Sequence, residues 1–473
     1  MEKSEFGVVG LGVMGSNIAL NLADKGVKVS VFNRLSKGKK NAVEAFLRGE
    51  GAGKKFLGFT NLKDFAQSLE SPRKILLMVK AGDAVDEMLR GLLPFLSRGD
   101  IVIDGGNSNF KDTARRLDEL EDSGILFVGA GISGGEEGAR NGASIMPGGN
   151  EKAWGKIKPY LQKIAAKLPN GEPCCEWIGG GASGHFVKTI HNGIEYADMQ
   201  MIAEIYQTMR KSGKFSNEEM AEVFEKFNRG KLESFLIEIT AKILRRKDEN
   251  GQFSLDLVLD AAGQKGTGKW SVESGAELGS PISCIAEALF ARFVSGMVEM
   301  RKSGARIFGS ECKFNMPSGA MGAVLENALY AAKIIAYAQG FSILSAASKK
   351  FGWNLNLGEI AKIWRGGCII RAKFLDRVTE AFSADCDLEN LLFSEFFAEE
   401  IRSSVNSLRE VSSLAAQGGI SMPAMFSALA YFDFVRQTES PSNLIQAQRD
   451  FFGAHTYERT DAPRGEFFHT NWE

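Results

Sequence analysis

The chain has 473 residues, which is too many for one ordinary hydrophobic core and predicts two or three domains. Its 57 Lys and Arg residues balance 58 Asp and Glu residues, which argues against a broad surface for nucleic acid or anionic membranes. The six cysteines form no C-x-x-C motif and no Cys/His cluster, so we expect reduced thiols, a cytoplasmic protein and no metal site. We expect neither a secretory signal nor a transmembrane helix, because no suitable apolar run is visible.

The chain begins with the pattern of a dinucleotide-binding unit. An apolar strand at 6–9 leads into a G-x-G-x-x-G turn, a helical pattern at 16–25 and a second strand at 27–32. The first glycine permits the turn, the second lets a pyrophosphate approach, and the third lets helix and strand pack closely. The helix N-terminus adds free N–H groups and the positive end of a dipole. The predicted cofactor contacts here are Gly10, Gly12, Val13, Met14 and Gly15.

The residues after the second strand predict the choice of cofactor. An Asp or Glu at this point would hold the ribose hydroxyls of NAD, but this chain has Asn33 and Arg34. No carboxylate follows the strand to repel a 2′-phosphate, and Arg34 can pair with one. NADP is therefore the predicted cofactor, with Asn33 and Arg34 among its contacts. The alternative is that Arg34 is an ordinary solvated arginine.

Further strands are predicted at 74–79, 101–103, 125–128 and 143–146, and helical patterns lie between several of them. Such a doubly wound sheet binds ligands outside the carboxyl ends of its strands. Three loops of small and polar residues, 79–82, 104–108 and 131–135, are expected there. Each alone is more often a plain turn, but together at one edge they favour a site. The predicted ligand contacts are Val79, Lys80, Ala81, Asn107, Ser133, Gly134 and Gly135.

A glycine run followed by a long helical pattern, 179–205, divides the chain. Helices dominate after it, with long apolar-periodic segments at 185–212, 283–302, 320–349 and 394–417. Side chains at spacings of three and four share one face of the first helix, and a face that packed as core would carry Leu, Ile or Met. This face carries instead Lys188, His191, Asn192 and Glu195.

The helical half contains an internal repeat. Comparing its two copies distinguishes positions that only pack from positions that carry polar groups on this face. Segment 188–230 aligns without gaps with 325–367, but the chemical face does not repeat. Ionisable groups are costly to bury unless they are paired or used, so the first copy is predicted to be a catalytic site with an acid and a base. The alternative is a buried Lys–Glu ion pair that only holds helices together. The corresponding positions in the second copy are Leu325, Ala328, Leu329 and Ala332.

Two later segments carry candidate ligand contacts. Loop 262–270 has three glycines and two lysines, which suits an oxyanion, although a basic surface loop is the alternative. Arg292 lies on the helix after it. The last 33 residues, 441–473, combine one short helix at 443–452 with aromatic and charged residues, which a free tail would not usually carry. We expect this tail to pack on a partner subunit, with Arg449 and His455 as its ligand contacts.

With these motifs the chain resembles the 6-phosphogluconate dehydrogenase family, decarboxylating enzymes that use NADP. The resemblance implies a Rossmann-like doubly wound α/β domain at 1–180, an all-helical substrate and dimerisation domain at 181–440 with the internal repeat, and a C-terminal tail at 441–473. It covers nearly the whole length and rests on the segments GLGVMG, FNR, MVKAG, DGGNS, GISGGEEGAR, GHFVKTIHNGIEYADMQ, AGQKGTGKW, QRDFFGAHTYE and FHTNW.

The resemblance implies oxidative decarboxylation of 6-phospho-D-gluconate to D-ribulose 5-phosphate and CO2 in the pentose phosphate pathway, without a metal. It implies that Lys188 takes the proton from the hydroxyl at carbon 3 and then stabilises the enolate oxygen. Glu195 then protonates carbon 1 of the enediol that remains after CO2 has left. These roles need a lowered pKa for Lys188 and a raised pKa for Glu195, and we expect burial to provide both.

The resemblance also distributes the substrate contacts. It places Asn107, Ser133, Gly134, Gly135, His191 and Asn192 around the sugar acid, and Tyr196, Lys265, Thr267 and Arg292 at its phosphate. In a homodimer, Arg449 and His455 of the partner chain would complete the phosphate site.

The family usually has Thr or Ser after the Asn–Arg pair, where this chain has Leu35 followed by Ser36, so we expect a softer preference for NADP. Two alternatives stay open. One is a related dehydrogenase of a non-phosphorylated 3-hydroxy acid, which would not need the loop at Lys265. The other is a non-catalytic NADP sensor, which would not keep both Lys188 and Glu195.

Overall fold

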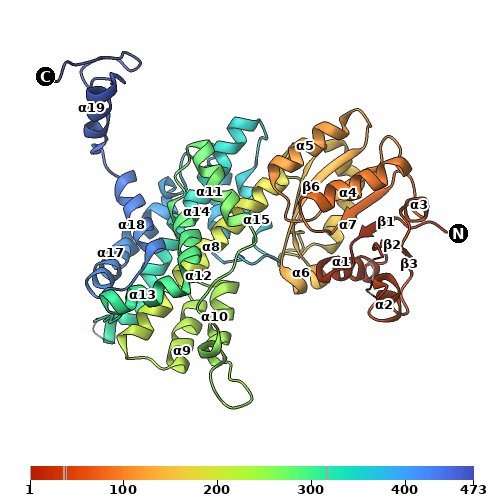
Figure 1. Ribbon diagram of the computed structural model, residues 1–473, viewed down its shortest axis with the longest axis horizontal. Helices are drawn as coiled ribbons and strands as arrows, with labels where there is room; N and C mark the ends of the chain where they lie inside the picture. The colour runs from red at the N-terminus through yellow and green to blue at the C-terminus, as the bar shows by residue number, and fades with distance from the viewer. Residues whose placement is uncertain (1, 36–37, 39, 316–317) are drawn as a thin grey trace.

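The computed structural model describes residues 2–35, 38, 40–315 and 318–473. Figure 1 shows a sheet-containing half, a larger helical half beside it, and a C-terminal segment that stands away from both. Helix α8 (Ser183–Ser212) follows the last strand of the sheet and runs through the helical half. The predicted fold class, a doubly wound α/β domain followed by an all-helical domain with a repeat, is confirmed.

The sheet has the strand order β3-β2-β1-β4-β5-β6-β7-β8, and only the β6–β7 pair is antiparallel. Its central strands β1, β2 and β4 are buried at every residue and mostly apolar, as expected for a sheet that is covered on both faces. The strands are β1 (Phe6–Val9), β2 (Val29–Phe32), β3 (Phe56–Phe59), β4 (Lys74–Leu77), β5 (Ile101–Asp104), β6 (Leu126–Ser133), β7 (Ser144–Gly149) and β8 (Gly179–Gly180).

Strands β3 and β8 are absent from the predicted set. Strand β3 is a half-buried edge strand with a glycine among its four residues, and β8 has only two residues. Neither therefore carries a periodic signal long enough to stand out from a loop.

Helices cover both faces of the sheet. Buried side chains of α1, α2, α6 and α7 form one core with it, and those of α3, α4 and α5 form another. These helices are α1 (Val13–Asp24), α2 (Ala42–Arg48), α3 (Leu62–Gln67), α4 (Asp83–Leu92), α5 (Phe110–Glu121), α6 (Gly135–Asn141) and α7 (Trp154–Ile164), with the short 3-10 turns η1 (Leu93–Phe95) and η2 (Glu151–Ala153).

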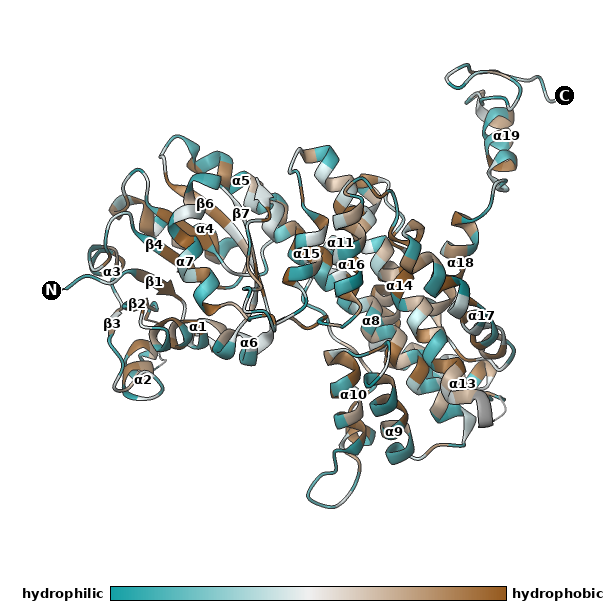
Figure 2. Cartoon of the chain, turned by 180° about the vertical axis from the view of Figure 1, so that it is seen from behind, coloured by the Kyte–Doolittle hydropathy of each residue, from teal (hydrophilic) through white to brown (hydrophobic). Residues whose placement is uncertain are grey.

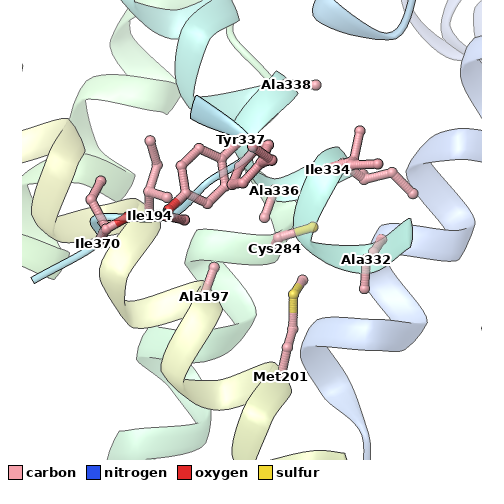
Figure 3. Packing of buried hydrophobic residues seen from close by; sticks show 14 of the residues in the cluster. Ile194, Ala197, Met201, Cys284, Ala332, Ile334, Ala336, Tyr337, Ala338 and Ile370 are labelled. Atoms are coloured by element: carbon pink, nitrogen blue, oxygen red, sulfur yellow. Dashed lines mark hydrogen bonds between the residues drawn. The ribbon is translucent and has the colours of Figure 1, made fainter. Parts of the chain in front are cut away.

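The helical half packs around α8 and α14 (Ser318–Phe351), whose side chains meet in one large core (Figure 3). Much of α14 is coloured as hydrophobic in Figure 2. The remaining helices are α9 (Asn217–Asn228), α10 (Phe235–Arg245), α11 (Thr267–Leu278), α12 (Ser283–Gly296), α13 (Val298–Phe308), α15 (Leu357–Ile363), α16 (Leu375–Ala384), α17 (Glu395–Gln417), α18 (Pro423–Val435) and α19 (Ser442–Gly453), with the 3-10 turns η3 (Ser254–Leu257) and η4 (Leu391–Phe393).

The predicted repeat is present in space. Helices α8 and α9 correspond to α14 and α15 at the sequence offset found above. In the second copy, the positions that match the chemical face are fully buried in the core: Leu325, Ala328, Leu329 and Ala332. The segment predicted as one helix over 283–302 is instead broken at Met297, where ψ turns to 56° and separates α12 from α13. In the part of the chain that the structure describes, no helix has the length and apolarity to cross a membrane.

A seam of glycines lets α8 lie directly against the sheet. A Cβ on Gly131 of β6 would lie 2.3 Å from Lys188 Cβ, and a Cβ on Gly184 of α8 would lie 2.2 Å from the carbonyl oxygen of Gly129. Both distances are too short for any side chain. The close approach therefore depends on these glycines, and it sets the start of α8 at the end of β6.

One buried ion pair joins the two copies of the repeat. Lys333 of α14 pairs with Asp198 of α8, and both side chains are about 2% exposed. The ammonium group also lies over the rings of Tyr337 and Phe374, at 5.5 and 5.7 Å. A charge at this depth is tolerated only when it is paired. The pair therefore fixes α14 against α8 at Asp198, three residues after Glu195.

Candidate functional site

A cleft of about 490 Å³ opens beyond the carboxyl ends of β1, β2 and β4. Ligands bind at this edge in open α/β sheets. The predicted cofactor residues that line it are Gly10, Gly12, Asn33, Arg34, Val79 and Lys80.

The glycine turn has the geometry that its motif predicts. Gly10 has φ +96°, and a Cβ on Gly15 would lie 1.8 Å from the carbonyl oxygen of Gly10. A Cβ on Gly12 would meet nothing within 4 Å, so this position faces open space, where a cofactor can approach. The side chain of Asn33 accepts a hydrogen bond from Leu11 N at 3.0 Å and so ties the end of β2 to the turn.

Other predicted cofactor residues lie outside the lining of this cleft. Val13 is 60% exposed in the first turn of α1, and Met14 is half-buried against the sheet core. Ala81 lies half-buried in the loop before α4. Asn107 is exposed in the turn after β5.

A carboxylate from another part of the chain stands beside Arg34. Glu87 of α4 accepts an ion-paired hydrogen bond from Arg34 Nη1 at 3.1 Å, and both residues line the cleft. The residues after β2 could not indicate this acid, because it comes from a segment 53 residues away. Leu35 is 63% exposed. Ser36 lies outside the described residues.

The four polar residues of α8 meet the end of β6. Lys188 Nζ lies 3.5 Å from His191 Nδ1, which is 3.0 Å from Asn192 Oδ1. The other ring nitrogen of His191 lies 3.3 Å from Ser133 Oγ, at the end of the strand. Glu195 Oε2 lies 3.9 Å from His191 Nδ1. The structure therefore brings together the helix face and the loop that the sequence singled out separately.

Burial controls the charges of this face. It lowers the pKa of Lys188 to about 8, against the opposing effect of the Glu195 carboxylate. It raises the pKa of Glu195, against the opposing charges of Lys188 and Arg292. The pKa of His191 falls well below its ordinary value because the ring is fully buried, so the imidazole is neutral. The face therefore combines an amine that can accept a proton with a carboxyl group that can hold one.

A neutral His191 has one donor and one acceptor. If Nδ1–H donates to Asn192 Oδ1, then Nε2 accepts from the Ser133 hydroxyl, and both contacts are satisfied. Its ring also packs edge-on against Trp364, with 5.4 Å between centroids. The imidazole is thus held in one orientation between helix and strand.

A second group of predicted residues gathers one turn further along α8. The Arg292 guanidinium stacks over the ring of Tyr196 at 3.5 Å and donates to the carbonyl oxygen of Gly263 at 3.1 Å. Thr267 is buried at the start of α11, while Lys265 is exposed in the loop before it. A cation beside a helix N-terminus is a suitable place for an anionic group.

The tail residues Arg449 and His455 do not reach this site within one chain. Arg449 donates to Gln446 Oε1 at 3.1 Å on α19, and the ring of His455 packs on Phe452. Figure 1 shows α19 standing apart from the rest of the helical half.

The segment 364–368 closes the site from the second copy of the repeat, and the sequence did not assign it a function. A Cβ on Gly134 would lie 2.3 Å from the carbonyl oxygen of Gly367, so this segment presses on the loop after β6. Buried Cys368 donates to the Trp364 carbonyl oxygen, and burial raises the pKa of its thiol to about 12, so it is neutral. Gly367 aligns with Gly230 at the end of the repeat.

Among the described residues, no group of three or more His, Cys, Asp and Glu side chains is arranged to hold a metal. All six cysteines are free.

Comparisons with known proteins agree with this architecture. The chain matches the family models "NAD binding domain of 6-phosphogluconate dehydrogenase" over residues 5–179 and "6-phosphogluconate dehydrogenase, C-terminal domain" over residues 184–472. The decarboxylating 6-phosphogluconate dehydrogenases of Rattus norvegicus and Homo sapiens are 50% and 49% identical to it, and each match covers 100% of this chain and 97% of the relative.

A solved structure agrees as well. It is the 6-phosphogluconate dehydrogenase of Plasmodium falciparum, described in its apo form, with its cofactor NADP+ and with its substrate 6-phosphogluconate. The match has a TM-score of 0.94 and 42% identity, and it covers 99% of this chain and 100% of that one. The chain belongs to the 6-phosphogluconate dehydrogenase family.

Proposed function

We propose that the chain catalyses the oxidative decarboxylation of 6-phospho-D-gluconate to D-ribulose 5-phosphate and CO2, with reduction of NADP, as a step of the pentose phosphate pathway. The observation that carries this proposal is the face of α8 at the open edge of the cofactor sheet, with a buried Lys188 and a largely buried Glu195. The full-length similarity to decarboxylating 6-phosphogluconate dehydrogenases supports the same reaction.

The cofactor cleft fits NADP. Gly12 leaves room for the pyrophosphate, the start of α1 provides backbone N–H groups, and Arg34 is placed for the 2′-phosphate. Bound NADP supplies the acceptor for the hydride from carbon 3. Val79 and Lys80 would hold it from the loop after β4.

Lys188 and Glu195 divide the proton transfers in this proposal. Neutral Lys188 takes the proton of the hydroxyl at carbon 3 as that carbon is oxidised. The ketone then accepts the electron pair left by departing CO2, and the new ammonium group stabilises the enolate oxygen. Glu195 gives its proton to carbon 1 of the resulting enediol, which was carbon 2 of the substrate, and so completes ribulose 5-phosphate. His191, Asn192 and Ser133 orient the sugar acid between them.

The phosphate of the substrate would lie at Arg292, Tyr196, Thr267 and Lys265. This cation cluster is the reason to prefer a phosphorylated acid over a plain 3-hydroxy acid. A homodimer would add Arg449 and His455 of the partner chain. Exposed apolar side chains support such an interface on α12 and α13, and on the tail: Phe290, Phe293, Met297, Met300, Leu444, Phe451 and Phe452.

We also propose that the chain divides into three parts, with boundaries at residues 180 and 440, and that the protein is located in the cytoplasm. The sheet ends with Gly180, and the helices of the main body end with α18 at Val435. The six free cysteines fit a reducing compartment.

Turnover with 6-phosphogluconate and NADP should release NADPH and trapped CO2 in equal amounts, while gluconate, which lacks the phosphate, should react far more weakly.

Replacing Lys188 with Met should lower kcat by about 1,000-fold, because no other group on this face can take the proton. The NADP dissociation constant should stay within about twofold of wild type. A matched control is Lys211→Met, on the exposed last turn of the same helix. Full activity of Lys188→Met would exclude Lys188 as the base.

The pH dependence of kcat/KM for 6-phosphogluconate should report the ionisation of Lys188. The base must be neutral in the free enzyme, and its pKa is about 8, so log kcat/KM should rise with unit slope below that pH and level off above it. Steady-state rates between pH 6 and pH 9.5 measure this directly. A profile that is flat from pH 6 to pH 8 would show that the base is already neutral and that burial does not set its pKa in this way.

The cofactor assignment makes opposite predictions for the two partners of the Arg34–Glu87 pair. Arg34→Ala should raise the KM for NADP at least tenfold more than the KM for NAD. Glu87→Gln releases Arg34 from an exposed pair, which is worth at most about 1 kcal/mol, so it should lower the KM for NADP by no more than about fivefold. Equal changes for NADP and NAD in Arg34→Ala would contradict the assignment.

A further inference from the structure

Arg116 is a fully buried arginine behind the proposed active site, and no role has been given to it above. It lies on α5 with no exposed side-chain surface. Its Nε donates to Asp86 Oδ1 at 2.7 Å, and its Nη2 donates to the carbonyl oxygen of Gly82 at 3.0 Å. Both partners belong to the start of α4, directly after the loop that carries Val79 and Lys80. The guanidinium holds the pKa of the Asp86 carboxyl below its usual range.

The third nitrogen of Arg116 faces the turn after β5. Nη1 lies 3.5 Å from Asp104 Oδ2, and within the described residues it has no hydrogen-bond partner. The Asp104 carboxylate accepts from Gly106 N at 3.0 Å and from Ser108 Oγ at 2.6 Å. These bonds fix the turn that presents Asn107. Arg116 therefore contacts the residues that fix two loops at the ligand-binding edge of the sheet, the loop before α4 and the turn after β5.

The same cluster reaches α8 through His185. This ring is 1% exposed, its Nδ1 lies 2.7 Å from Thr113 Oγ1 of α5, and its charge would interact with Asp104 and Arg116. Burial lowers the pKa of His185, so the ring is neutral. It lies one helical turn before Lys188. Helix α5, the two loops and the start of α8 are thus joined by one set of buried polar contacts.

Burying an arginine beside the buried carboxylate of Asp104 is not the cheapest way to stabilise this core, because apolar side chains of similar size often do so equally well. A guanidinium does offer a planar fork that fixes the relative positions of several acceptors. What it fixes here is the spacing between the loop at Lys80, the turn at Asn107 and the helix of Lys188.

We infer that Arg116 is a positioning residue for hydride transfer, which sets the cofactor loop after β4 and the turn after β5 at the correct distance from Lys188. This inference rests on the function proposed above. Misplacing reacting atoms by about 1 Å costs up to about 100-fold in rate. The loss should therefore appear in the hydride-transfer step and in the KM for NADP as well as in stability.

The test compares Arg116→Met with Arg115→Met, assayed with NADP and 6-phosphogluconate. Arg115 is the adjacent residue and bonds the same Asp86 at 3.1 Å, but its side chain is 42% exposed. We expect Arg116→Met to lower kcat at least tenfold, to raise the KM for NADP, and to increase the isotope effect on kcat with substrate deuterated at carbon 3. Arg115→Met should stay within about twofold of wild type in all three.

Arg116→Lys keeps the charge but not the fork, so it should recover only part of kcat. If Arg116→Met does not fold, Asp104→Asn disturbs the same cluster with no change of size and should raise the isotope effect in the same way. A folded Arg116→Met or Asp104→Asn enzyme with unchanged kcat, KM and isotope effect but a lower Tm would overturn the inference and leave Arg116 a purely structural role. Inactive wild-type protein would instead count against the proposed function.

Discussion

Helix α8 reaches the edge of the cofactor sheet because strand β6 has glycines where helix and strand meet. Gly131 leaves room for Lys188, and Gly184 lets the first turn of the helix approach the backbone of β6. A methyl group at either glycine would overlap its neighbour, so the helix would have to move outward. The position of Lys188 relative to the sheet therefore depends on a backbone contact, and backbone contacts adjust less readily than side chains.

This contact also determines the electrostatics of the site. A lysine pressed against a strand is buried, and burial moves its pKa toward neutrality. The same burial moves the pKa of Glu195 upward, although this side chain keeps 21% of its surface exposed. One close approach thus prepares a base and an acid two helical turns apart. The neutral His191 between them adds no competing charge.

Much of this site follows from local patterns in the sequence. The G-x-G-x-x-G turn is encoded by neighbouring residues, and the polar face of α8 stands out because its copy in α14 is apolar at the same positions. Of the β6 glycines, the sequence predicts only Gly131 as part of a ligand loop. Their contact with α8 involves a helix about 50 residues later, and no periodic pattern records such a pairing.

The misses have the same origin. The Arg34–Glu87 pair, the closure by segment 364–368 and the buried Arg116 cluster join segments that are distant in sequence. The role of Arg449 and His455 stays a prediction, because both lie on a tail that stands away from its own site and their role depends on a second chain. Strands β3 and β8 are too short or too exposed to carry a pattern. Local chemistry was therefore predictable, whereas long-range contacts between polar groups were not.

The central claim is that two residues on one face of α8 carry out separate proton transfers. Lys188 accepts a proton from the substrate, and Glu195 donates one to the product. A single-turnover experiment with Glu195→Gln, saturated with NADP and 6-phosphogluconate, tests it most directly. The account predicts that NADPH still forms in a burst close to the wild-type rate, while ribulose 5-phosphate appears at least about 100-fold more slowly. Loss of the NADPH burst in parallel with the product would contradict the account, because both carboxyl and amine would then serve the same step.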